Sequence, residues 1–170
     1  FSAIADIADR NNVVYFGMSG NITQNRGQKC NKMAFPSSKP VSLESAGGTG
    51  YVLEQGLGES IFQIGADYIW GNDNTQYVKD VLVPQDDAEY RGDVSLPLGT
   101  TDFSSALSQA EESGADVVVL NNFGADQITA LKQSQEFGLM DGETVITVPG
   151  STTDIMAAAG ESTYAYDNLY

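Results

Sequence analysis

Short apolar runs alternate along this chain with segments of helical spacing, and a polar or glycine-containing loop follows most of the runs. The clearest example covers residues 115–139. Residues 116–120 are apolar after the first position, which is typical of a strand buried on both faces. The polar residues 121–124 end that strand, and apolar residues then recur at roughly helical spacing until Gly138. The pattern predicts a strand, a short loop and a helix.

The same alternation predicts the other elements. Further strands are expected over residues 13–16, 60–64, 88–98 and 143–148. Helices are expected over residues 2–11, 43–57, 72–83, 103–112 and 155–159. Strands that alternate with helices indicate an α/β fold with a parallel sheet and helices on both faces.

Two local details of these helices are also predicted. Ile4, Ile7 and Ala8 recur at helical spacing, so they are expected to form the buried face of the first helix. Thr101 or Asp102 is expected to cap the helix over residues 103–112, because a short side-chain oxygen can accept from the first free backbone N–H groups.

The loops that follow the strands are the first candidates for a functional site. Right-handed connections between parallel strands place such loops at one edge of the sheet, where ligands bind in open α/β folds. Four polar loops are expected there, at residues 17–21, 67–71, 121–124 and 150–154. None of them carries a cationic side chain.

Two of these loops each allow two interpretations. The first contains Gly17, Ser19, Gly20 and Asn21, and it fits either an ordinary turn or a loop that presents backbone N–H groups to a ligand. The second contains the only tryptophan, Trp70. That residue fits either a core position or a flat apolar wall beside a ligand.

The charge balance limits the partners of the protein. The chain has 23 Asp and Glu residues against 8 Lys and Arg, and its formal net charge is −15. Nucleic acid is excluded as a partner because phosphate binding needs clustered cations, and an anionic membrane surface is disfavoured for the same reason. The acidic residues are spread over the whole length, which favours the hypothesis of a protein adapted to strong brine.

The usual catalytic and metal-binding arrangements are missing from the sequence. The chain has no histidine, which excludes a Ser-His-Asp or Cys-His arrangement, and the single cysteine, Cys30, cannot form an internal disulfide. Neither a zinc site nor a phosphate-binding glycine loop is expected. The pair Asp86-Asp87 fits a solvated acidic turn better than a calcium site. Polar but unreactive loops favour binding over catalysis, with no cofactor and no metal.

Several segments together resemble one known family. VVYFGMSGN, GADYIWG, PLGTTDFSSAL, GADVVVL and ALKQSQEFGL occur in the order and spacing of the leucine/isoleucine/valine-binding family of solute receptors for ABC importers. The resemblance covers most of residues 1–160, and GTTDF and EFGL are its most specific parts. It implies the type I periplasmic-binding fold, with two α/β lobes that are joined by three crossings and close over a ligand.

The resemblance also implies a division of the chain. Residues 1–36 would be the end of the first lobe and residues 37–41 a crossing between lobes. Residues 42–165 would be the second lobe, and residues 166–170 the start of a return crossing. The first lobe is then incomplete, and we expect the sequence to be a fragment of a longer protein.

Site residues follow from the resemblance position by position. Ser19 falls where the family places a hydroxyl that receives the ligand carboxylate together with neighbouring backbone N–H groups. Trp70 falls at an aromatic wall, and Phe123 and Gly124 at an adjacent pair that is often aromatic. The expected ligand-binding set is Gly17, Ser19, Gly20, Asn21, Trp70, Asn122, Phe123, Gly124, Gly150 and Ser151.

One of these positions departs from the family pattern. Gly150 falls where amino-acid receptors carry an acidic residue for the ligand ammonium. An unpaired ammonium in a closed cleft would cost a few kcal/mol, roughly that of an unsatisfied buried charge. This argument favours an amide, a urea-like compound or a carboxylate over a branched-chain amino acid, with Asp154 as a substitute for the missing acid.

The expected function is therefore that of a non-enzymatic, extracytoplasmic solute-binding protein, attached to the cell surface, which delivers a small polar solute to the membrane permease of an ABC importer. No apolar run approaches the length of a membrane helix, so direct membrane insertion of this segment is not expected. A sensory or regulatory ligand-binding domain on the same fold remains the alternative, and an enzyme of doubly wound fold is a weaker one.

Overall fold

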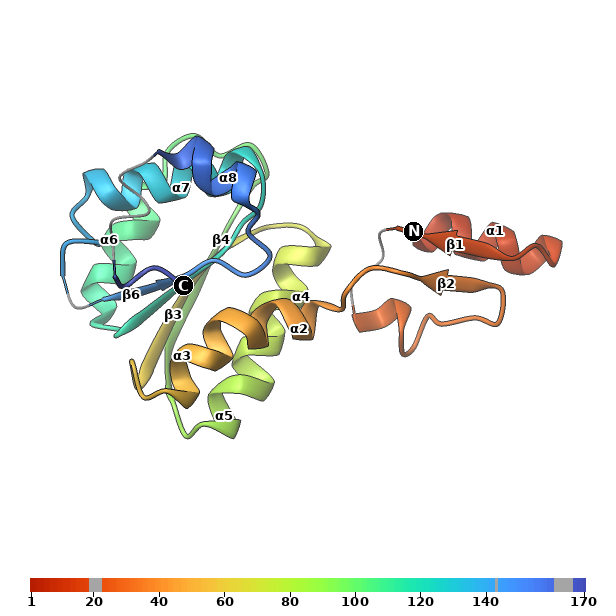
Figure 1. Cartoon of the computed structure of the whole chain (residues 1–170), viewed down its shortest axis with the longest axis horizontal. Helices are drawn as coiled ribbons and strands as arrows, with labels where there is room; N and C mark the ends of the chain where they lie inside the picture. The colour runs from red at the N-terminus through yellow and green to blue at the C-terminus, as the bar shows by residue number, and fades with distance from the viewer. Residues whose placement is uncertain (19–22, 143, 161–166) are drawn as a thin grey trace.

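The computed structural model describes residues 1–18, 23–142, 144–160 and 167–170, and it contains two separate parallel sheets. The smaller sheet pairs β1 (Tyr15–Gly17) with β2 (Ala34–Pro36). The larger sheet has four strands in the order β4-β3-β5-β6. A short segment after β2 connects the two parts, which lie at opposite ends of the molecule in Figure 1.

The larger sheet confirms the predicted parallel α/β fold. It consists of β3 (Ser60–Ala66), β4 (Glu89–Leu96), β5 (Val117–Asn121) and β6 (Val145–Thr147), and every pair is parallel. All residues of β3 and β5 are buried, whereas exposed and half-buried residues alternate along the edge strand β4. The continuous apolar run in β5 is thus explained by its central place in the sheet.

Helices cover both faces of this sheet. On one face lie α6 (Ser104–Ser113), α7 (Ala125–Glu136) and α8 (Thr153–Ala159), whose apolar residues join Ile64, Leu120 and Ile146 in one core cluster. The other face is covered by two longer helical runs, and their apolar residues form a second core cluster with Ile61 and Val119.

Each of those two runs contains a wider, π-helical turn. The first comprises α2 (Val41–Ser45), η2 (Ala46–Gly50) and α3 (Tyr51–Glu54). The second comprises α4 (Ile69–Tyr77), η3 (Val78–Leu82) and α5 (Val83–Gln85). No helix in the described part of the chain is long and apolar enough to cross a membrane.

The N-terminal part is smaller and less well covered. It consists of α1 (Ser2–Asn11), the small sheet and the short helix η1 (Thr23–Asn25). The prediction that Ile4 and Ile7 are buried is wrong, because their side chains are 51% and 52% exposed. Ala5 and Ala8 are the buried residues of α1, so the small sheet packs against the face of the helix that carries the alanines.

The predicted elements occur in the predicted order with some shifted boundaries, but the strand β2 was not predicted. The first strand begins at Tyr15 and not at Val13 as predicted. Val13 and Val14, which precede it, are exposed. Phe103 and not Thr101 or Asp102 is the N-cap residue of α6. Asp102 nevertheless accepts a hydrogen bond of 3.0 Å from the first helical N–H, that of Ser104, as expected.

Trp70 lies in the first turn of α4 and not in a loop, which corrects its predicted place. The strand β3 extends to Ala66 and α4 begins at Ile69, so only two residues separate them. Gly71 permits this tight connection, since a Cβ at that position would lie 2.1 Å from the carbonyl oxygen of Ala66.

The close approach at Gly71 predicts a strong effect on stability. Gly71→Ala should lower the free energy of unfolding by about 3 kcal/mol, because the strand end and the helix must separate to admit a methyl group. Gly47→Ala is the matched control, since a Cβ there meets nothing within 4 Å and Ala is the better helix former by up to ~1 kcal/mol. Urea unfolding measures both variants, and equal stabilities would contradict the packing described here.

Candidate functional site

Three loops meet at the carboxyl edge of the larger sheet, as the parallel topology requires. They follow β3, β5 and β6, and an aromatic group lies beside the first two: Tyr68 is the N-cap of α4, Trp70 is in its first turn, and Phe123 follows β5. The ring centroid of Trp70 lies 5.9 Å from that of Tyr68, which it stacks against, and 6.1 Å from that of Phe123, which it meets edge-on. Trp70 is 8% exposed and Phe123 is 49% exposed, so Phe123 presents more of its surface at this edge.

A carboxylate that the sequence analysis missed lies beside this aromatic group. Glu44 belongs to α2, and its Oε2 accepts a hydrogen bond of 2.8 Å from the indole Nε1–H of Trp70. Gly150 lies against the same pair. A Cβ at Gly150 would be 3.0 Å from Cζ2 of Trp70 and 3.4 Å from Oε2 of Glu44.

Buried polar contacts fix α2 against α4 and so bring Glu44 to Trp70. The hydroxyl of Ser45 donates to Oδ1 of Asn74 at 2.6 Å, and Nδ2 of Asn74 donates to the carbonyl of Trp70 at 3.0 Å. Ser45 and Asn74 are both fully buried. Ser45 follows Glu44 directly in the sequence. Its bond to Asn74 therefore fixes this part of α2 and keeps the Glu44 carboxylate at the sheet edge.

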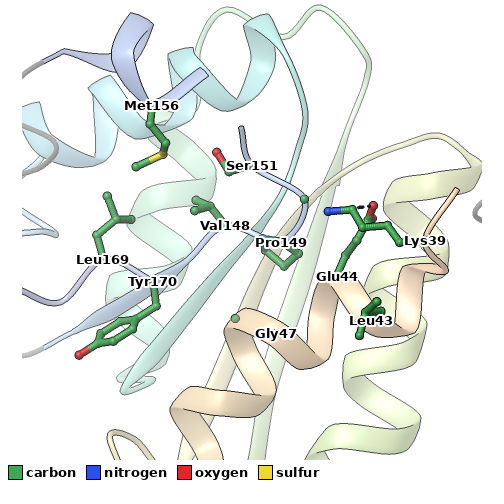
Figure 2. A pocket seen from close by; sticks show the side chains of 12 residues that line it. Lys39, Leu43, Glu44, Gly47, Val148, Pro149, Ser151, Met156, Leu169 and Tyr170 are labelled. Atoms are coloured by element: carbon green, nitrogen blue, oxygen red, sulfur yellow. Dashed lines mark ion pairs between the residues drawn. The ribbon is translucent and has the colours of Figure 1, made fainter. Parts of the chain in front are cut away.

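Lys39 is the ionic partner of Glu44. The Lys39 Nζ lies 3.6 Å from Oε1 of Glu44, and Figure 2 shows this pair at one side of the pocket. The two side chains differ in exposure, at 53% for Lys39 and 6% for Glu44. The carboxylate is therefore buried, whereas the lysine reaches it from solvent.

These two residues line a cavity of about 520 Å³. Figure 2 shows the cavity between the helical run that begins with α2 and the segment that follows β6. Gly150 and Ser151 line it, which the sequence analysis predicted as site positions, whereas Trp70, Asn122, Phe123 and Gly124 lie outside its lining. The other lining residues are Leu43, Gly47, Gly48, Val148, Pro149, Met156, Leu169 and Tyr170.

Several buried polar atoms at the same edge keep unused hydrogen-bonding capacity. Nδ2 of Asn121 donates to Oε1 of Gln63 at 2.7 Å and to Oγ1 of Thr75 at 3.1 Å. Among the residues that the structure describes, Oδ1 of Asn121, Oδ1 of Asn122 and Oγ of Ser151 have no partner. Such atoms can bind water or a polar solute.

The structure places the remaining predicted site residues as follows. Ser19, Gly20 and Asn21 lie outside the described residues, and Gly17 ends β1 in a buried position. Gly124 is the N-cap of α7 and has a φ of 63°, a left-handed value that favours glycine. Asp154 is exposed in the first turn of α8 and does not line the cavity.

The charges around Tyr68 make this edge electrostatically negative. Burial is the largest cause that raises the pKa of Tyr68 to about 12, and the carboxylates of Glu44 and Asp126 add to the effect. Asp126 is held nearby by the backbone N–H of Gly99, which donates to its Oδ2 at 3.0 Å. Two carboxylates that disfavour a phenolate at this position would favour a cation there.

The described residues contain neither a metal-binding cluster nor a disulfide. No group of three or more His, Cys, Asp or Glu residues in the described ranges could hold a metal ion, and Cys30 is exposed and free. A parallel sheet with helices on both faces and a polar cavity at its carboxyl edge defines a ligand-binding α/β protein.

Comparison with known proteins identifies the family. The family model described as periplasmic binding protein matches residues 1–170. The chain therefore belongs to the periplasmic binding protein family, and its fold is the type I periplasmic-binding-protein fold. The search among curated proteins gave no match to this chain.

Solved structures of similar fold support this assignment. A periplasmic binding protein from Burkholderia mallei is 25% identical with a TM-score of 0.87, over 95% of this chain and 42% of that one. A branched chain amino acid ABC transporter periplasmic ligand-binding protein from Burkholderia xenovorans is 25% identical with a TM-score of 0.79, over 94% and 42%. The chain thus spans less than half the length of either protein.

A third structure shows the same fold at lower identity. It is an ABC transporter solute binding protein from R. palustris in complex with 4-hydroxybenzoate, 18% identical with a TM-score of 0.83, over 95% of this chain and 44% of that one.

The proximity of Glu44 to Tyr68 predicts a change in tyrosine titration. Because the folded pKa of Tyr68 is raised from 10.0 to about 12, the stability that its phenol contributes is complete below the ordinary pKa and is lost as pH rises through the folded one. Glu44→Gln removes one of the negative charges and should lower the Tyr68 pKa. The Tyr68 pKa is measured by ultraviolet difference titration, with Tyr68→Phe as the reference that lacks this phenol. Glu54→Gln is the exposed control, and an unchanged titration in Glu44→Gln would contradict the electrostatic argument.

Proposed function

We propose that this chain is part of an extracytoplasmic solute-binding protein of an ABC importer, which captures a small polar solute by closure of two lobes. The observation that carries the proposal is the polar cavity at the carboxyl edge of the sheet. It is lined by Glu44, whose side chain is buried, and by Ser151, whose buried hydroxyl has no partner among the residues that the structure describes. The family assignment supports a binding role and not an enzymatic one.

The solute class is an amino acid, an amide, a urea-like compound or a carboxylate. A similar structure supports the first of these, because the B. xenovorans protein is described as a branched chain amino acid ABC transporter periplasmic ligand-binding protein. In this proposal Trp70 and Phe123 form an aromatic wall, and Gly150 and Ser151 lie where the solute enters the cavity. Asn122 and Gly124 complete that wall, while Gly17, Ser19, Gly20 and Asn21 approach from the other lobe.

The two sheets support the proposed division into lobes. Residues 1–36 would end the first lobe, residues 37–41 would form a crossing, residues 42–165 the second lobe, and residues 166–170 the start of a return crossing. One hydrogen bond already joins the two parts, since the backbone N–H of Thr23 donates to Oδ2 of Asp73 at 2.7 Å.

The permease of the importer would be the protein partner of the whole receptor. The family assignment supports a location outside the cytoplasm. Attachment to the cell surface as a lipoprotein belongs to the proposal, because a receptor that delivers solute to a membrane permease benefits from a high local concentration.

A binding screen tests the proposed function. The complete receptor is heated with members of each solute class, and a solute at ~100 times its Kd should stabilise the folded state by about 2.7 kcal/mol. X-ray scattering with that solute should show a decrease in the radius of gyration, because the lobes close. Failure of every class to raise the unfolding temperature would contradict a solute-binding role.

The acidic surface supports a further proposal, that the protein is adapted to high salt. A net charge of −15 on 170 residues destabilises the compact state by self-repulsion. Chloride salt at molar concentration reduces the screening length from ~10 Å to ~3 Å. The unfolding temperature should therefore rise from low to molar potassium chloride, and calorimetry that showed no rise would contradict salt adaptation.

A further inference from the structure

Glu44 and Lys39 form an unusual ion pair at the wall of the cavity. A charge-assisted hydrogen bond between an ammonium and a carboxylate is about 2.8 Å long, whereas Nζ of Lys39 lies 3.6 Å from Oε1 of Glu44. The Glu44 side chain is 6% exposed and the Lys39 side chain is 53% exposed. The ammonium of Lys39 thus pairs with the buried Glu44 from the solvent side. The flexible lysine side chain can also move its ammonium away from the carboxylate.

The carboxylate itself is fixed in place. The indole N–H of Trp70 holds Oε2 at 2.8 Å, and the buried bonds of Ser45 and Asn74 hold the helix that carries it. The indole is a neutral donor, so it orients the carboxylate without changing the net charge of the Glu44 side chain. A second ammonium can therefore take the place of Lys39 without any movement of the carboxylate.

Space for such a group exists next to Glu44. Gly47, Gly48 and Gly150 line the cavity and place no side chains in it. At Gly150 the φ of 75° and the contacts with Trp70 and Glu44 oppose any larger residue. An acidic side chain at position 150 is therefore incompatible with this packing, and Glu44 supplies a carboxylate at the same place from another element.

The rest of the cavity lining and its electrostatics fit the same kind of solute. Leu43, Val148, Met156 and Leu169 give the cavity an apolar portion. Burial is the largest cause that raises the pKa of the Tyr68 phenol, and Glu44 and Asp126 lie close enough to add to its effect, so two carboxylates are present at this edge. A small amine with an apolar substituent satisfies both conditions, and an apolar amino acid is one such amine.

We propose that Glu44 selects solutes with a protonated amine, and that Lys39 is an internal ammonium that occupies the carboxylate until the solute displaces it. The inference rests on the proposed solute-binding function and specifies its substrate class. It replaces the earlier expectation from Gly150 that an ammonium would be unpaired, because the missing carboxylate comes from α2.

Matched pairs of compounds test this inference on the complete receptor. Each pair differs in the amino group alone: leucine and isocaproate, phenylalanine and hydrocinnamate, and γ-aminobutyrate and butyrate. Titration calorimetry gives the Kd of each compound. The parent protein should bind at least one amine more tightly than its deaminated partner, and equal or weaker binding of the amine in every pair would overturn the inference.

Two variants assign the preference to these residues. Glu44→Gln keeps an acceptor for Trp70 but removes the charge, so it should weaken amine binding about ten- to a hundredfold. Binding of the deaminated partner, where measurable, should change less than about threefold and shows that the variant is folded. Lys39→Met removes the internal competitor and should tighten amine binding about two- to fivefold.

Exposed residues provide the controls, and the outcomes separate the two proposals. Glu54→Gln and Lys132→Met change the same charges at exposed positions and should leave every Kd unchanged. Equal amine affinity in the parent and Glu44→Gln would overturn the role of Glu44, and weaker amine binding in Lys39→Met would overturn that of Lys39. If neutral or anionic solutes alone bind, the amine inference fails and the solute-binding function stands. If no solute of any class binds, the proposed function itself fails.

Discussion

The parallel pairing of β3 with β5 is the constraint on which the site depends. Both strands are buried along their whole length, so their ends are fixed by the core on either face. Since parallel strands share one direction, the segments after β3, β5 and β6 emerge at the same edge. Trp70, Phe123 and Gly150 meet there although they are far apart in the sequence.

Close packing at two glycines then determines the chemistry of this edge. Gly71 lets α4 start directly after β3, which turns the indole of Trp70 away from solvent. Gly150 lets the segment after β6 approach that indole and Glu44. The indole N–H consequently points at a carboxylate and not at water. An anion held in this way at a cavity wall is the basis for the selectivity that we propose.

The sequence was sufficient for the fold and for part of the site. The apolar run before Asn121 and its polar end predicted a buried parallel strand, and the structure confirms it. Glu44 could not be found this way, because its contacts with Trp70 and Gly150 depend on how α2 packs on α4. Ile4 and Ile7 were misassigned because helical spacing alone does not reveal which face the neighbouring sheet covers.

The account is tested most directly by a crystal structure of the complete receptor with a bound amine solute. The amine nitrogen should lie within about 3 Å of a carboxylate oxygen of Glu44, as in a direct hydrogen bond. Nζ of Lys39 should have moved away from that carboxylate, while the bond from Trp70 remains. A solute bound elsewhere, with the Lys39–Glu44 pair still in place, would contradict the account.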